Sequence, residues 1–98
     1  MSALDFDATV VASRDQVAAD LADEVIILGM RDGVYYGVEA VAARIWALVQ
    51  QPVRLDDIVR TILAEYEVTE AKCRTEVLAF VTQLEARGLV TRVTNDRP

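Results

Sequence analysis

Carboxylates, one thiol and three tyrosine hydroxyls are the groups of this sequence that could do chemistry. The chain has sixteen Asp and Glu residues, Cys73 as its only cysteine, and no histidine. Without histidine it cannot build a Ser-His-Asp or Cys-His site, and the usual ligand sets for zinc and non-haem iron are missing. The neighbouring acids Asp23-Glu24 and Asp56-Asp57 could suggest a metal site, but a solvated turn and the first turn of a helix explain them better. We therefore expect no catalytic residue, no metal and no cofactor.

The composition is that of a small, soluble, folded protein. The chain has 98 residues, 53% of them hydrophobic, which indicates one domain with a modest core. Its net charge is −6, and its ten Lys and Arg residues are scattered. A nucleic-acid partner is therefore not expected, because binding to phosphates needs a basic patch. No apolar run approaches the ~20 residues of a membrane span. The first fifteen residues carry acids where a signal peptide carries bases, so we expect a cytoplasmic protein with no membrane partner.

The elements that would position any site begin with a hairpin. Glu24–Met30 (EVIILGM) is a strong strand signal, and Val34–Val38 (VYYGV) follows after Asp32-Gly33, a dipeptide typical of type I′ turns. Thr9–Ser13 is a short strand or an arm, and Gln16–Leu21 is a weak strand candidate.

Three helices and a closing strand are expected after the hairpin. Apolar spacing predicts them at Glu39–Gln50, Leu55–Tyr66 and Thr69–Arg87, with the strand at Leu89–Val93. Thr69 is a suitable N-cap and Gly88 a suitable residue after the last turn. The predicted fold class is α+β: an N-terminal three-stranded antiparallel sheet followed by three helices, similar to a winged helix-turn-helix. The expected division is 1–15 as an arm or short strand, 16–93 as the domain and 94–98 as a tail.

The tyrosine pair is the feature that most needs an explanation. Strand alternation places Tyr36 with Val34 and Val38 on one face, and Tyr35 with Gly37 on the other. A two-residue turn would set Met30 opposite Tyr35 and Gly29 opposite Tyr36. The simplest interpretation makes Tyr36 a core residue and Tyr35 a surface cross-strand partner. The functional alternative is that this strand forms the sheet edge and binds another chain as an added strand.

On the third helix, the stripe Cys73, Val77, Phe80, Val81 and Leu84 should face the core. Cys73 is better explained as a small core residue than as a reactive thiol. Lys72 and Arg74 could meet an acidic ligand side chain, or they could be solvated with Glu70 paired to Arg74.

Three stretches together carry a resemblance: DEVIILGMRDGVYYGV, EAVAARIWALV and LDDIVRTILAEYEVTEAKCRTEVLAFVTQLEARGLV. In order and spacing they resemble the PqqD-like family, also called the RiPP recognition element, where RiPPs are ribosomally made and post-translationally modified peptides. Within that family, YYGV and ARIW are most similar to the stand-alone leader-binding proteins of lasso-peptide biosynthesis. The resemblance covers roughly residues 16–90. Family members commonly have Asn where this chain has Glu39, so the usual helix cap is missing.

The resemblance implies a non-catalytic module that binds the leader of a precursor peptide. The leader would add as an antiparallel strand to the third strand of the sheet, and its side chains would lie between that strand and the third helix. Carried onto this chain, the strand residues are Val34, Tyr35, Tyr36 and Gly37. The helix residues are Lys72, Cys73, Glu76, Val77 and Phe80.

A separate, transglutaminase-like leader peptidase and a cyclase would then act on the presented peptide. Two alternatives stay open: the same module in another modified-peptide or quinone-cofactor pathway, and a winged-helix DNA-binding regulator. Acids on the third helix (Glu70, Glu76 and Glu85) count against the regulator.

Overall fold

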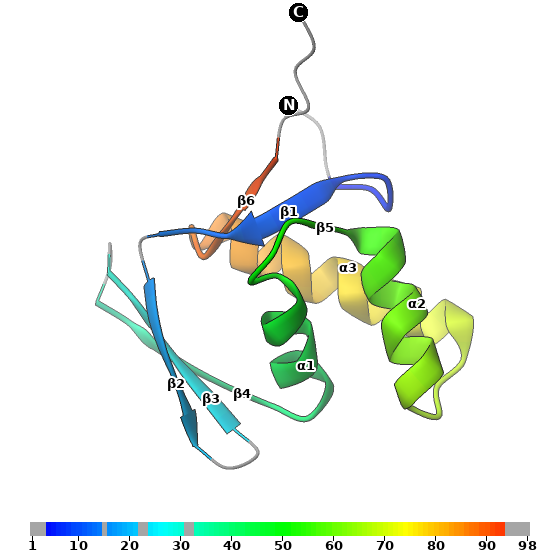
Figure 1. Cartoon of the computed structure of the whole chain (residues 1–98), viewed down its shortest axis with the longest axis horizontal. Coiled ribbons are helices and arrows are strands. Elements are labelled where there is room, and N and C mark those ends of the chain that lie inside the picture. Colours follow the sequence, from blue (N-terminus) through cyan, green and yellow to red (C-terminus); the bar gives the residue numbers. More distant parts are fainter. Residues whose placement is uncertain (1–3, 15, 22–23, 31–32, 94–98) are drawn as a thin grey trace, which may run out of the picture.

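The computed structural model describes residues 4–14, 16–21, 24–30 and 33–93. Two sheets and three helices form it (Figure 1). In chain order, the elements are β1 (Thr9–Ala12), β2 (Gln16–Leu21), β3 (Glu24–Gly29), β4 (Tyr35–Glu39), α1 (Val41–Leu48), β5 (Val53–Arg54), α2 (Leu55–Glu65), α3 (Glu70–Ala86) and β6 (Val90–Arg92). The predicted α+β class, with a three-stranded antiparallel sheet ahead of three helices, is confirmed.

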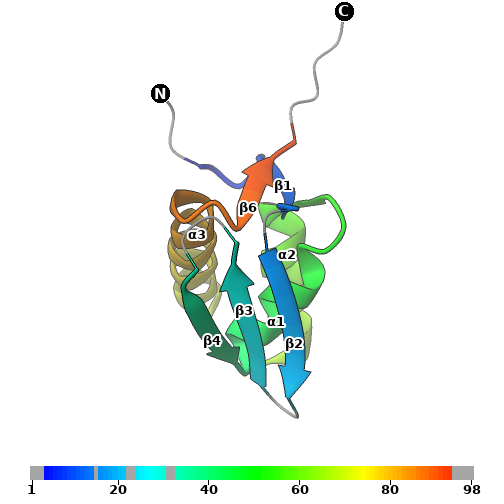
Figure 2. The same cartoon turned by 90° about the vertical axis from the view of Figure 1, so that its left-hand side faces the viewer.

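The larger sheet has the order β2-β3-β4, and both of its strand pairs are antiparallel. The three helices lie on one face of this sheet, and β4 forms the edge nearest α3 (Figure 2). Because β3 is rich in β-branched and aliphatic residues, it suits the central position between two neighbours. The strand that carries both tyrosines is therefore an edge strand.

The register of β3 with β4 differs from the one that a two-residue turn predicts. Tyr36 lies opposite Ile27, and Tyr35 lies opposite Leu28. The amide of Gly29 donates to the carbonyl of Val34 at 3.0 Å, so the connection runs over residues 30–33. The expected pairs of Met30 with Tyr35 and of Gly29 with Tyr36 are therefore wrong. Asp32, the first residue of the predicted turn, lies outside the described residues.

The two tyrosines nevertheless lie on the predicted faces of the sheet. The register is displaced by two residues, and a displacement by an even number leaves every side chain on its original face. Tyr36 and Val38 are half-buried against the core, whereas Tyr35 is 70% exposed. Tyr36 thus anchors β4 to its own domain, and Tyr35 points away from it.

A second, smaller sheet has the order β5-β1-β6 and joins distant parts of the chain. β1 pairs with β5 on one side and with β6 on the other, both antiparallel. Val10 of β1 is fully buried. β5 was not predicted, because a two-residue strand carries no periodic signal. Because β6 follows α3 directly and pairs with β1, this sheet also holds the end of α3 in place.

Helix α3 has well-defined caps at both ends. The hydroxyl oxygen of Thr69 accepts the amide of Lys72 at 3.2 Å, which confirms the predicted N-cap. At the other end, Gly88 has φ of +76°, a conformation that glycine adopts without strain. The amide of Leu89 donates to the carbonyl of Leu84 at 2.8 Å, closing the last turn. The caps therefore determine where Arg87 and Leu89 lie.

Helix α1 begins less favourably. Its N-cap residue, Ala40, has φ of +56° and ψ of −128°, and no side chain caps the first turn. A residue with a Cβ atom is strained in this region. The resemblance placed the missing cap at Glu39, whereas the structure places the N-cap one residue later, at Ala40, and Glu39 is the last residue of β4.

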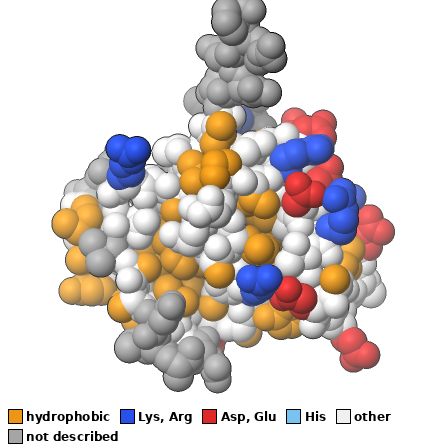
Figure 3. All heavy atoms as spheres, viewed as in Figure 1, with side chains coloured by type: hydrophobic (Ala, Val, Ile, Leu, Met, Phe, Trp, Pro, Cys, Tyr) orange, Lys and Arg blue, Asp and Glu red, His pale blue; other side chains and the backbone are white. Residues whose placement is uncertain are grey.

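The core lies between the helices and the inner face of the larger sheet. The predicted stripe on α3 is buried at Cys73, Val77, Val81 and Leu84, and half-buried at Phe80. Trp46 is 3% exposed and belongs to the core. Hydrophobic side chains also reach the surface over the half of the molecule that holds the larger sheet, whereas charges of both signs intermingle over the opposite half (Figure 3). None of the described helices has the length and apolarity that a membrane crossing requires.

Candidate functional site

The free edge of β4 offers backbone groups to another chain. Residue pairs of an antiparallel ladder alternate between hydrogen-bonded and non-hydrogen-bonded. Since Gly29 and Val34 form a hydrogen-bonded pair, Tyr36 and Val38 also direct their amides and carbonyls toward β3. The backbone groups of Tyr35, Gly37 and Glu39 therefore point away from β3, to a side where no described strand pairs with β4. An edge of this kind is a template for one more strand.

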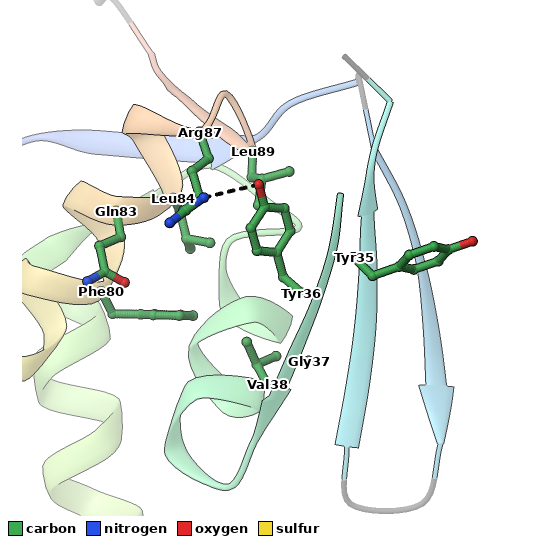
Figure 4. Close-up of a pocket in the computed structure, with 9 residues that line it drawn as sticks. All are labelled: Tyr35, Tyr36, Gly37, Val38, Phe80, Gln83, Leu84, Arg87 and Leu89. Atoms are coloured by element: carbon green, nitrogen blue, oxygen red, sulfur yellow. Dashed lines mark hydrogen bonds between the residues drawn. The ribbon is translucent and has the colours of Figure 1, made fainter. Parts of the chain in front are cut away.

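A groove runs beside this edge, between β4 and the C-terminal half of α3 (Figure 4). We call it the β4–α3 groove; it has a volume of about 410 Å³. Its lining residues are Tyr35, Tyr36, Gly37, Val38, Phe80, Gln83, Leu84, Arg87 and Leu89. Most of the inner wall is apolar, and the polar groups of Gln83 and Arg87 lie on the α3 side. The ring of Tyr35 points away from the groove, whereas the ring of Tyr36 points into it.

Tyr36 and Arg87 form the polar end of the groove. A guanidinium nitrogen of Arg87 (Nη1) donates to the Tyr36 hydroxyl oxygen at 3.3 Å. The guanidinium carbon also lies 5.1 Å from the centre of the Tyr36 ring. A cation over an aromatic face is attracted by the ring quadrupole. The two contacts together hold Arg87 against the start of β4.

The structure brings four of the predicted site residues to this groove. Tyr35, Tyr36 and Gly37 line it from the strand, and Phe80 lines it from the helix. Val34 directly precedes β4 and is 43% exposed, but it does not line the groove.

The other predicted helix residues lie elsewhere on α3. Cys73 and Val77 are 2% and 1% exposed and belong to the core. Together with Glu76 they line a separate cavity of only about 30 Å³, next to Val41. Lys72 is exposed on the first turn of α3 and lines neither cavity.

Five lining residues were not predicted as site residues from the sequence: Val38, Gln83, Leu84, Arg87 and Leu89. The closing segment LEARGLV is a signal that could have found Leu84, Arg87 and Leu89, because Gly88 ends the helix there and returns the chain toward the sheet. Because β4 starts near the end of α3, the groove is built from the last turns of the helix and not from its first turns.

The thiol of Cys73 is not available for chemistry in this fold. It is buried and donates to the carbonyl oxygen of Val59 at 3.8 Å. Burial raises the pKa of Cys73, so the neutral thiol is favoured. Among the described residues no group of His, Cys, Asp or Glu side chains could hold a metal ion.

The fold and the site place the chain in a class of small winged-helix-like domains with an open strand edge beside an apolar groove. A family described as coenzyme PQQ synthesis protein D (PqqD) matches residues 24–90. That range covers more than half of the chain and includes β3, β4 and all three helices. The chain therefore belongs to the PqqD family, as the sequence resemblance implied.

Two solved structures are similar to this chain over most of its length. One is TbiB1 in complex with the TbiA(beta) leader peptide: it is 32% identical, with a TM-score of 0.78, and the match covers 87% of this chain and 99% of that one. The other is a lasso peptide synthetase B1 complexed with the leader peptide, 23% identical, with a TM-score of 0.68 over 84% of this chain and 96% of that one. The second likeness supports the fold alone. Among curated proteins, none matches the sequence significantly.

Proposed function

We propose that this chain binds the leader of a ribosomally made precursor peptide by β-strand addition to β4, and presents it to a separate leader peptidase in lasso-peptide maturation. The observation that carries the proposal is the open edge of β4 next to the β4–α3 groove. The similar structure that is 32% identical supports it further, because that structure is a complex with a leader peptide.

The geometry of the edge suggests how a leader would be held. Backbone groups of Tyr35, Gly37 and Glu39 would form the ladder with an antiparallel leader strand, which supplies affinity independent of sequence. Leader residues opposite Tyr36 and Val38 would direct their side chains to the inner face of the sheet, into the groove. Because much of the groove wall is apolar, the position opposite Val38 would provide sequence preference through an aromatic, Pro or Leu side chain.

The proposed role is recognition and not catalysis. The groove residues supply an aromatic ring, aliphatic groups, an amide and a guanidinium, which are groups that bind a peptide. Cleavage of the leader would fall to a separate transglutaminase-like peptidase, and a cyclase would close the core peptide. The purified chain should then cleave nothing by itself, and leader cleavage should appear when the peptidase is added.

Titration with the synthetic leader encoded beside this gene tests the proposal. We expect micromolar or tighter affinity by calorimetry, and slowed amide exchange at Tyr35, Gly37 and Glu39 on binding. Double-stranded DNA at physiological salt should give no binding. The proposal fails if the leader produces neither heat nor chemical-shift changes, or if the shifts concentrate away from β4 and α3.

A second candidate has one observation in its favour, since the matching family is described by coenzyme PQQ synthesis. In that case the same edge and groove would bind the precursor peptide of a quinone-cofactor pathway. Side-by-side titration with both precursors separates the candidates. Tighter binding of the quinone precursor would favour the second.

A further inference from the structure

The β4–α3 groove is electrically asymmetric along its length. Of the nine described residues that line it, only Arg87 is charged. At the other end of β4 the exposed acid is Glu39, which alternation places with Tyr35 and Gly37 on the face away from the groove. The side chains of a strand bound along the edge would therefore meet one charged lining residue in the groove, Arg87.

Arg87 is held in place and still has hydrogen-bonding capacity. Its contacts with the ring and hydroxyl of Tyr36 use one of its five N–H donors. None of the carboxylates in the described part of the chain forms an ion pair with it. Arg87 is also the C-cap residue of α3, where the helix dipole favours a cation. Within the described part of the chain, the positive charge is thus positioned at the groove without being neutralised.

The ladder geometry determines which peptide side chain would meet Arg87. An antiparallel strand on β4 runs from Glu39 toward Tyr35, and its alternate side chains enter the groove. One of these faces Val38. The next lies two residues further along the peptide and faces Tyr36, where the guanidinium of Arg87 lies.

We propose that Arg87 selects an acidic side chain, Asp or Glu, at the peptide position opposite Tyr36, two residues C-terminal to an apolar side chain opposite Val38. This inference rests on the proposed function and adds to it one specificity determinant. A carboxylate can accept two parallel hydrogen bonds from a guanidinium. An apolar side chain at that position would desolvate the charge without replacing its hydrogen bonds.

Selection from a display library of short randomised peptides tests the inference and does not require the sequence of the leader. The baits are the wild-type chain, Arg87→Glu, and Arg60→Glu as a control with the same change in net charge. Arg60 lies on α2, outside the groove. We expect the wild type and the control to enrich Asp or Glu two residues after an apolar residue. Arg87→Glu should enrich Lys or Arg at that position.

Charge-swap titrations with one enriched peptide measure how much Arg87 contributes to peptide affinity. Arg87→Glu should weaken binding of the acidic peptide by about tenfold, and replacing the peptide acid by Lys should recover most of that loss. Arg87→Lys should retain part of the affinity, and higher ionic strength should reduce the difference between variants. Thermal melts identify any variant that no longer folds, and Arg87→Gln then replaces it.

The possible failures are distinguishable. If peptides are enriched and protect the β4 amides, but with no acidic preference or with the same preference for Arg87→Glu, this inference is overturned while the proposed function stands. If no peptide is enriched and the encoded leader does not bind, the proposed function is overturned together with the inference.

Discussion

Replacing Gly37 by proline tests the outward-facing amides of β4 without removing a hydrogen bond between β3 and β4. The amide of Gly37 faces the free edge, so Gly37→Pro removes no hydrogen bond between β3 and β4. Proline is tolerated in an edge strand when its missing N–H faces solvent. A Cβ atom at this position would lie 3.0 Å from Oε2 of Glu24, the mobile end of an exposed side chain that can move aside. Gly37→Ala adds the same Cβ atom and keeps the amide, which makes it the matched control.

The expected effect follows from one lost backbone hydrogen bond. Its net contribution is about 0.5–1.5 kcal/mol, and leaving the partner carbonyl of the peptide unsatisfied costs about 1–3 kcal/mol. Leader affinity should therefore fall by roughly five- to a hundredfold in Gly37→Pro relative to Gly37→Ala. The free energy of unfolding of the two variants should agree to within about 1 kcal/mol, because the internal ladder is unchanged.

Calorimetric titration of both variants with the encoded leader measures the leader affinity. Urea denaturation measures the free energy of unfolding. Equal leader affinity of Gly37→Pro and Gly37→Ala would refute strand addition at this edge. Should Gly37→Pro prove unstable, the same hydrogen bond can be weakened by changing the leader peptide instead of the protein. A leader with an ester in place of the peptide group opposite Gly37 has a weaker acceptor, and it should bind the wild-type chain less tightly.

Three further substitutions or modifications probe the same structure. Tyr35→Ala should weaken leader binding about two- to fivefold, the value of a cross-strand contact, with little change in the thermal midpoint because the ring is 70% exposed. A larger loss of stability than of affinity would instead make Tyr35 a structural residue. Ala40→Gly should raise the free energy of unfolding by about 1 kcal/mol and the thermal midpoint by roughly 4–8 °C. The reason is that glycine removes the backbone strain of a positive φ at the start of α1. An unchanged midpoint in calorimetry would contradict this. Because burial raises the pKa of Cys73, its thiolate population near neutral pH is below that of an exposed cysteine, and Ellman's reagent should react only after unfolding. Rapid reaction of the native protein would show that the thiol is accessible.

The sequence predicts the elements and their faces well because these follow from local periodicity. Alternation correctly separates Tyr35 from Tyr36, and helical spacing correctly identifies the buried stripe that includes Cys73 and Val77. Cap residues are equally local, which is why Thr69 and Gly88 could be recognised as the ends of α3.

The β3–β4 register and the second sheet could not be predicted from local periodicity. The β3–β4 register depends on a connection that runs over residues 30–33, and Asp32-Gly33 suggested a shorter turn. The second sheet joins residues 9–12, 53–54 and 90–92, which are too short and too far apart in the chain to signal their pairing. Such contacts form only when the helices bring these segments together.

The sequence by itself therefore determined the fold class, the family resemblance and the strand on which the proposed binding edge lies. Only the tertiary structure decided which part of α3 faces that strand. A hydrophobic stripe shows that a helix face is buried, but not which element covers each turn. Here the first turns, at Cys73 and Val77, pack into the core, whereas the last turns face the start of β4 and bring Arg87 to Tyr36. That outcome depends on the angle at which α3 crosses the sheet, and packing between distant segments sets this angle.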